Sequence, residues 1–137
     1  MIQYLDTSNP TEFKLESFKD NRGYLSVLPF TDLPFIPKRL FAIIPNSSLE
    51  SRGKHAHKTC WQLIIVTAGA LKVNYENKSI NATVCLVFGQ SLLVPPWNWC
   101  EVFFESINSS SVVLASHLYD EDDYITERPN SAATDIK

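Results

Sequence analysis

The sequence predicts an all-β fold with little helix. From Gly23 onward, short apolar, β-branched or aromatic runs alternate with turn residues, at roughly the 8–12-residue spacing that is typical of β-sandwiches and β-barrels. Prolines stand between these runs and not within them, as expected because proline cannot donate a ladder hydrogen bond. No window of about 11–18 residues repeats its apolar residues with the period of an amphipathic helix.

The first expected strands are delimited by glycine and proline. Tyr24–Leu28 follows Gly23 and ends at Pro29, and Leu40–Ile44 ends at Pro45. Before Gly23 the pattern is weaker, and we expect only a short turn of helix within Asp6–Phe18.

Two hairpins are expected in the middle of the chain. Segment 67–69, which contains glycine, joins Trp61–Thr67 to Ala70–Tyr75. Segment 76–79, which contains asparagine, joins the latter strand to Ile80–Val87. The remaining expected strands are Ser91–Val94, closed by Pro95 and Pro96, Glu101–Phe104 and Val112–Ser116.

Length and composition favour one globular domain. The 137 residues have a mass of 15.5 kDa, and 45% of them are hydrophobic while 20% are charged, which is typical of a folded domain. We therefore expect a single domain over residues 1–137. Residues 1–19 form its N-terminal segment, and the polar residues 128–137 are expected to be a flexible tail.

Charge and hydropathy limit the partners and the compartment. The formal net charge of −3 and the absence of a basic run argue against a nucleic-acid partner. No apolar stretch approaches the ~20 residues needed to cross a bilayer, so we expect no membrane partner. The N-terminal residues lack the pattern of a secretory signal, and a cytoplasmic location is the expectation. Three cysteines without CxxC spacing are expected to be reduced thiols: Cys60, Cys85 and Cys100.

Two of the three histidines form the pair His55 and His57. In an extended strand alternate residues face the same way, so the two imidazoles should project side by side. Such a pair can exchange protons or ligate a metal near neutral pH. A surface pair without a role is the alternative.

The spacing after the pair is informative. His57 is followed by four residues and Gln62, and then by six residues and Gly69. This arrangement resembles the first motif of the cupins, with Gln62 where metal-binding cupins usually carry glutamate. In the second motif Cys100 stands where a third histidine ligand would be expected. With an amide and a thiol in place of two ligands, we expect no functional metal.

Most of the chain is similar to a narrower group, the WxcM-like family of sugar-nucleotide 3,4-ketoisomerases, which acts on dTDP-4-keto-6-deoxy-D-glucose. The matching blocks extend from about residue 20 to residue 125. They are Asp20–Leu25, Lys38–Phe41, Arg52–Lys58, Gln62 with Gly69, Pro95–Glu101, Leu114–Ser116 and Tyr119–Ile125.

The resemblance implies a cupin double-stranded β-helix, a jelly-roll-like barrel that works without a cofactor. It also implies a homodimer, in which the N-terminal segment 1–19 is exchanged between subunits. The substrate implied is a dTDP-linked keto-deoxysugar, used in deoxysugar biosynthesis for a surface polysaccharide such as lipopolysaccharide.

The chemistry can be compared with the residues. Moving a carbonyl from C4 to C3 requires removal of the C3 proton, formation of an enediol and return of a proton to C4, for which histidine is well matched. We assign the carbon-bound proton to His55 and the protons on oxygen to His57. Arg52 and Gln62 are candidate donors to the enediolate. Alternatively, Arg52 only holds a turn and Gln62 only orients a histidine.

Arginines suit the substrate's diphosphate, and Arg39 and Arg22 are the candidates; ordinary surface ion pairs are the alternative for both. Trp97, Trp99, Phe103 and Phe104 could stack on a ring of the substrate, although strand alternation places about half of such residues in the core, and Trp99 is expected to be structural.

Segment 120–124 is acidic, which disfavours contact with a diphosphate, and is interpreted as structural or as a dimer contact. A carboxylate partner for a histidine or an arginine is the second interpretation. Many family members carry a tyrosine where this chain has Ala42, so another donor is required if that tyrosine is catalytic, and Tyr24 is the candidate.

Three other functions stay open. They are a sugar-nucleotide 3,5-epimerase, a cupin that binds a nucleotide or carbohydrate without turnover, and a metal-dependent oxygenase.

Overall fold

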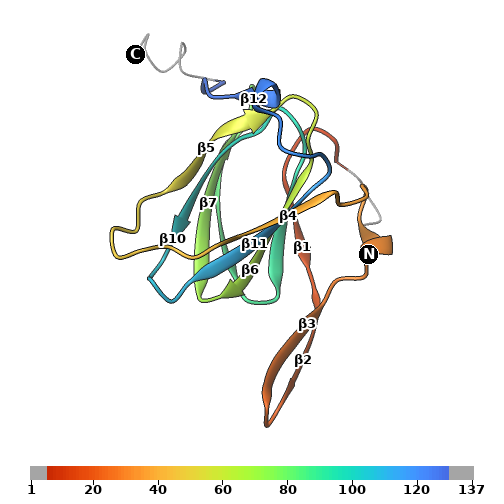
Figure 1. Ribbon diagram of the computed structural model, residues 1–137, viewed down its shortest axis with the longest axis vertical. Coiled ribbons are helices and arrows are strands. Elements are labelled where there is room, and N and C mark those ends of the chain that lie inside the picture. The colour runs from red at the N-terminus through yellow and green to blue at the C-terminus, as the bar shows by residue number, and fades with distance from the viewer. Residues whose placement is uncertain (1–5, 130–137) are drawn as a thin grey trace.

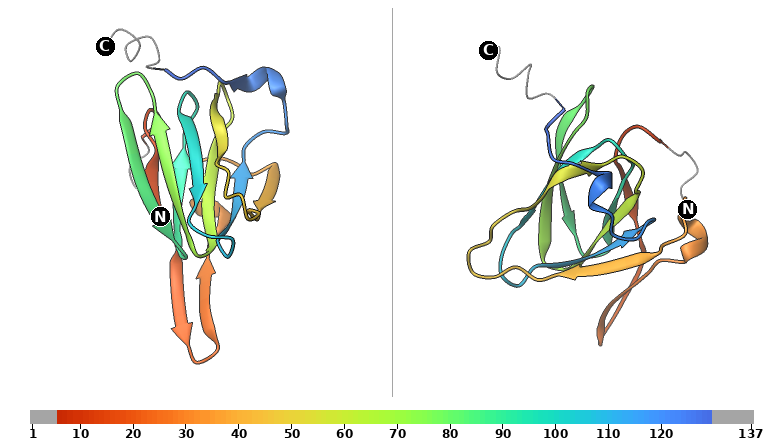
Figure 2. Two further views of the ribbon diagram at one scale, coloured as in Figure 1. Left: turned by 90° about the vertical axis from the view of Figure 1, so that its left-hand side faces the viewer. Right: turned by 45° about the horizontal axis from the view of Figure 1, so that its top comes forward.

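The computed structural model describes residues 6–129 and confirms the all-β prediction (Figure 1). Two five-stranded antiparallel sheets pack face to face as a jelly-roll-like barrel (Figures 1 and 2). The first sheet has the order β1 (Thr11–Lys14), β9 (Gln90–Val94), β6 (Gln62–Ala68), β11 (Ser110–Ala115) and β4 (Arg39–Ile43). The second has the order β12 (Tyr124–Ile125), β5 (Arg52–His57), β10 (Trp99–Phe104), β7 (Ala70–Glu76) and β8 (Asn81–Val87).

All eight predicted strands are present, with ends displaced by one or two residues. The hairpin predicted at segment 67–69 is confirmed, and Gly69 takes a φ of +66° in the tight turn between β6 and β7. The predicted turn of helix within Asp6–Phe18 is wrong. That segment contains β1 and most of β2 (Glu16–Asp20), because β1 pairs with β9 as the edge strand of the first sheet and buries Phe13.

The space between the sheets is filled at one end by apolar side chains. Their alternation along each strand places them on the inner faces, so they form one contiguous core. The buried members are Ile64, Val66, Leu71, Val73, Leu86, Leu92, Val94, Cys100, Val102, Phe104 and Val113. A second cluster covers the outer face of the first sheet and includes Phe13, Leu15, Leu63, Leu93 and Leu114. The core holds the strands rigidly around the remaining space.

A hairpin of β2 and β3 (Gly23–Val27) projects away from the barrel (Figure 2). Its residues are almost all exposed, including the apolar Phe18 and Leu25. The only helices within residues 6–129 are the 3₁₀ turns η1 (Phe30–Asp32) and η2 (Glu121–Asp123), and neither is long enough to cross a membrane.

After β11 the chain returns across one end of the barrel, where β12 pairs with β5 (Figure 1). Arg128, the first residue of the predicted flexible tail, pairs with the buried carboxylate of Glu76 at 2.7 Å, and its guanidinium lies over the ring of Trp99. The rest of that tail from residue 130, and residues 1–5 of the predicted exchanged segment, lie outside the described residues.

Candidate active site

A cavity of about 380 Å³ opens between the two sheets. Its walls come from inward-facing residues of β4, β5, β6 and β10, together with the C-terminal segment that carries β12. Apolar side chains make up much of the lining, and a few polar groups converge on it, which is the usual composition of a small-molecule site. The polar and aromatic lining residues are Arg39, Phe41, Arg52, His55, His57, Gln62, Asn98, Ser111, Tyr119 and Tyr124.

The histidine pair faces this cavity, as strand alternation predicts. The ring centroids of His55 and His57 are 4.9 Å apart, with an interplanar angle of 80°. Both rings line the cavity from β5, so the prediction that they project side by side is confirmed.

A β-bulge in β5 places Arg52 on the same face. His55 lies opposite Cys100 and Arg52 lies opposite Val102, so Lys54 is an extra residue in β5. In a regular strand Arg52 and His55, which are three positions apart, would point to opposite faces. Gly53 and Lys54 take positive φ values of +92° and +62° to form the bulge. Arg52 and His55 consequently line the same cavity.

Gly53 is required for this bulge, and replacing it with alanine is expected to destabilise the protein by about 1–3 kcal/mol because of backbone strain. A Cβ at Gly53 would lie 2.7 Å from the carbonyl oxygen of Cys100. Thermal unfolding measures the loss. The control is Lys54→Gly, which suits a left-handed position and is expected to leave the melting temperature unchanged or raised. Equal melting temperatures for Gly53→Ala and the wild type would contradict the role given to Gly53.

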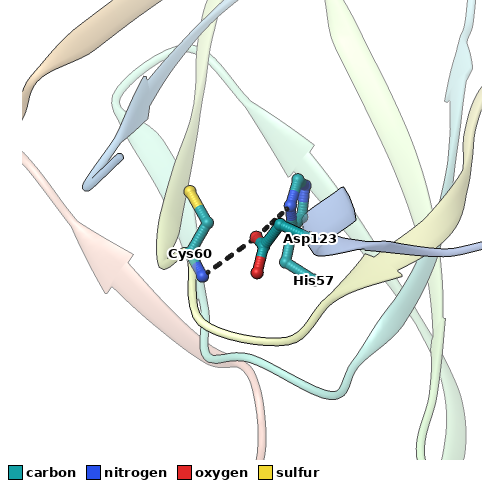
Figure 3. Close-up of side chains that lie close together, drawn as sticks. All are labelled: His57, Cys60 and Asp123. Carbon is teal, nitrogen blue, oxygen red and sulfur yellow. Dashed lines mark hydrogen bonds and ion pairs between the residues drawn. The ribbon is translucent and has the colours of Figure 1, made fainter. Parts of the chain in front are cut away.

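His57 is held by a carboxylate (Figure 3). Its Nδ1 lies 3.0 Å from Oδ2 of Asp123. The same carboxylate accepts hydrogen bonds from the backbone N–H and hydroxyl of Thr59, at 2.8 and 2.7 Å, and from the N–H of Cys60 at 3.3 Å. Burial alone would raise the pKa of Asp123, but these hydrogen bonds outweigh it and hold the pKa below its usual value. Asp123 is therefore ionised at neutral pH, and Nδ1 of His57 donates to it.

The other ring nitrogen of His57 is free for chemistry. Its Nε2 is buried and has no hydrogen-bond partner within residues 6–129, while the ring lines the cavity. Desolvation lowers the pKa of His57 below its ordinary value, and His55 and Arg39 lower it further, although Asp123 opposes the change. The result is a neutral imidazole whose buried Nε2 lone pair has no partner among residues 6–129.

His55 has the same tautomer for a different reason. Its Nδ1 lies 2.9 Å from the carbonyl oxygen of Gly53, which can only accept, so Nδ1 donates and Nε2 carries the lone pair. Desolvation is the main cause that lowers the pKa of His55, with a smaller contribution from Arg39, while the bond to Gly53 opposes the shift. Both imidazoles are thus poised as neutral bases.

The structure brings together five of the six predicted site residues. Arg39, Arg52 and Gln62 line the cavity with the two histidines, and Nε of Arg39 donates to the carbonyl oxygen of His117. Arg22 is elsewhere, at the tip of the β2–β3 hairpin, where it pairs with Asp20 and its side chain is 86% exposed.

Three other residues considered for the site do not line the cavity. Tyr24, the suggested substitute donor, lies on the same hairpin and does not line the cavity. Trp99 is buried and its Nε1–H donates to the carbonyl oxygen of Thr126, which confirms a structural role, and Phe104 belongs to the core.

The acidic segment supplies residues that were not placed in the site. The interpretation of segment 120–124 as only structural is wrong for Asp123, which is the carboxylate partner of His57, so the second interpretation is confirmed. Tyr119 and Tyr124 line the cavity and were not predicted as site residues. The signal was present, because these residues belong to the block Tyr119–Ile125 that carries the family resemblance.

His57, Cys60 and Asp123 present three possible ligand atoms within 4.8 Å of one another, but their chemistry does not fit a metal ion. In Figure 3 the carboxylate faces the imidazole and the N–H of Cys60, while the thiol points away from it. Both the Nδ1 and the carboxylate are already hydrogen-bonded. At the position of the third cupin ligand, burial raises the pKa of the Cys100 thiol to about 12, so it stays neutral and is a poor ligand.

Comparisons with known proteins agree with this geometry. The family model described as "FdtA: WxcM-like, C-terminal" matches residues 8–133. A TDP-4-oxo-6-deoxy-α-D-glucose-3,4-oxoisomerase from Aneurinibacillus thermoaerophilus is 34% identical over 124 residues, which cover 87% of this chain and 89% of the relative.

Solved structures extend the comparison. The sugar 3,4-ketoisomerase QdtA from Thermoanaerobacterium thermosaccharolyticum, in complex with TDP, superimposes with a TM-score of 0.81 at 27% identity, covering 95% of this chain and 98% of that one. A dTDP-4-dehydrorhamnose 3,5-epimerase from Bacillus anthracis has a TM-score of 0.76 at only 14% identity, covering 90% and 81%, and shares the fold alone. The family match and the identity to the oxoisomerase establish that the chain belongs to the WxcM-like family of sugar-nucleotide 3,4-ketoisomerases.

Proposed function

We propose that the chain is an isomerase that moves the keto group of a TDP-linked 4-keto-6-deoxyhexose from C4 to C3. The observation that carries the proposal is the pair of neutral imidazoles, His55 and His57, which line one cavity and whose Nε2 atoms have no hydrogen-bond partner among residues 6–129. The substrate class is the one named for the oxoisomerase relative. No metal or organic cofactor is needed for the steps below.

The proton transfers balance without a further reactant. The C4 ketone acidifies the neighbouring C3–H, and Nε2 of His55 removes that proton as the electron pair moves toward the C4 oxygen. The resulting enediolate gains a proton on O4 and loses the proton of O3, which we assign to His57. His55 then returns a proton to C4, leaving a ketone at C3.

Cationic and amide donors would stabilise the intermediate. Arg52 and Gln62 line the cavity with the histidines and are proposed to donate to the oxygens of the enediolate, where negative charge develops. Arg39 is proposed to bind the diphosphate, because a guanidinium can donate two parallel hydrogen bonds to phosphate oxygens.

A homodimer is proposed on the basis of exposed apolar surface. Phe18 and Leu25 on the projecting hairpin are 51% and 60% exposed, and Leu40 and Ile44 at the edge strand β4 are 59% and 76% exposed. Association through this surface would bury these side chains, and exchange of the N-terminal segment 1–19 between subunits is the proposed arrangement. Light scattering on the purified protein tests the dimer. The expected mass is near 31 kDa, about twice that of the chain.

We also propose a cytoplasmic enzyme that supplies deoxysugars for a surface polysaccharide. The supporting facts are the family and the nucleotide-linked substrate named for the relative.

The activity is expected to persist below the pKa of an ordinary imidazole. Because desolvation lowers the pKa of both histidines, they lose their protons at lower pH than the usual 6.5 and stay neutral, as proton abstraction requires. The acid limb of kcat/KM should therefore fall below pH 6.5, and a pH–rate profile measures it. An acid limb well above pH 6.5 would contradict a neutral base in a desolvated site.

Incubation with TDP-4-keto-6-deoxyglucose tests the function itself. NMR of the product should show the carbonyl carbon at C3 in place of C4. A well-folded protein that binds the nucleotide sugar and leaves it unchanged would favour a binding protein and overturn the proposal.

A further inference from the structure

Tyr124 contacts both histidines of the cavity. Its ring centroid lies 4.4 Å from that of His55, with an interplanar angle of 32°, and 4.6 Å from that of His57, with an angle of 63°. Since the two imidazoles are 4.9 Å apart, the three rings form a closed triangle. Within residues 6–129, Tyr124 is the only aromatic ring in contact with either imidazole besides the other imidazole.

The backbone fixes this ring firmly. Tyr124 lies directly opposite His57 in the pairing of β12 with β5, and opposite residues of an antiparallel pair share a face. On one side of Tyr124, the N–H of Lys58 donates to the carbonyl oxygen of Asp123 at 2.9 Å. On the other side, Trp99 donates to Thr126. The ring is thus placed by the same short segment that carries Asp123.

His55 has the greater need of such support. Asp123 orients His57 through a carboxylate, whereas His55 has one hydrogen bond among the described residues, from Nδ1 to Gly53. That bond sets the tautomer but allows the imidazole to swing about it. A ring packed against the imidazole at 4.4 Å, with a tilt of 32°, restricts that motion.

We propose that Tyr124 is a positioning residue whose ring, and not its hydroxyl, holds both imidazoles in the orientation that proton transfer requires. The kinetic part of this inference rests on the proposed isomerase function, and the spectroscopic part does not. The competing possibility is that the phenol donates a proton, in place of the tyrosine that relatives carry at the position of Ala42.

Two substitutions separate the ring from the hydroxyl. Tyr124→Phe keeps the ring and should keep a kcat close to that of the wild type. Tyr124→Leu removes the ring and should lower kcat by about 10–100-fold, since displacing a reacting group by about 1 Å has an effect of this size. KM is expected to rise by a smaller factor, since Tyr124 also lines the cavity while the main loss falls on alignment. A loss in Tyr124→Phe as large as that in Tyr124→Leu would overturn the proposal.

NMR of the histidine ring protons tests the contact without turnover. The chain has three histidines, and the third, His117, does not line the cavity and serves as an internal reference. In Tyr124→Leu the Cε1–H and Cδ2–H resonances of His55 and His57 should move as the ring current is lost, while those of His117 stay in place. Tyr119→Leu removes a neighbouring ring 5.7 Å from Tyr124 and should leave both cavity histidines near their wild-type positions.

Unchanged histidine resonances in folded Tyr124→Leu would overturn the inference. A wild type that turns over no nucleotide sugar, yet shows the expected shifts in Tyr124→Leu, would refute the proposed reaction and leave only the contact between the ring and the two imidazoles supported.

Discussion

His55→Asn is expected to lower kcat by about 10²–10⁴-fold, which is the usual contribution of a positioned general acid–base group. In the structure Nε2 of His55 carries the lone pair of a desolvated imidazole that lines the cavity. Asparagine has an amide at this position instead, and an amide cannot take up a proton at neutral pH. Steady-state kinetics with TDP-4-keto-6-deoxyglucose measures the loss, and nucleotide binding should be largely retained.

His117→Asn is the matched control for this substitution. His117 carries the same side chain but lies outside the lining of the cavity, with its Nδ1 hydrogen-bonded to Ser116. It should leave kcat close to that of the wild type. A His55→Asn variant that folds normally and turns over as fast as His117→Asn would exclude His55 as the base.

Asp123→Asn is expected to lower kcat by about 10²–10⁴-fold, because it changes the tautomer of an imidazole that transfers protons. The carboxylate accepts from Nδ1 of His57 and so keeps the lone pair on Nε2. An amide can present N–H to Nδ1 instead, which favours the other tautomer and puts a proton on Nε2. The loss should appear in kcat, because Asp123 does not line the cavity where the substrate would bind.

Asp122→Asn provides the control for charge at this segment. Asp122 is the neighbouring residue in η2 and is exposed, so the same change of charge is made without touching His57. Its kcat should stay near the wild-type value. Equal kinetic losses in Asp122→Asn and Asp123→Asn would show that the general charge of the segment matters and that the hydrogen bond to His57 does not.

The local pattern was sufficient to predict the barrel and the histidine pair. Alternating apolar residues identified eight of the strands, because inner and outer faces differ in polarity along strands such as β6 and β7. They did not delimit β5, whose residues Arg52–His57 are mostly polar. The local pattern was also insufficient for β1 and β2, whose few buried residues gain their partners from strands distant in sequence. The intrinsic strand propensity of a residue carries no information about which distant strand it will pair with.

The site depends on two features that spacing alone does not reveal. Strand alternation would have placed Arg52 and His55 on opposite faces, and only the bulge at Gly53 and Lys54 brings them together. The contact between His57 and Asp123 joins residues 66 positions apart, through a strand of two residues that has no periodicity to detect. The resemblance to the family located this second segment, although the role of its carboxylate required the structure.

Incubation of the wild type with TDP-4-keto-6-deoxyglucose in deuterium oxide tests the central claim most directly. If His55 takes the C3 proton and returns one to C4, NMR should show deuterium at C4 of the 3-keto product and at C3 of the recovered substrate, with none at C5. Deuterium at C3 and C5 of a sugar that keeps its 4-keto group would instead identify an epimerase and contradict the account.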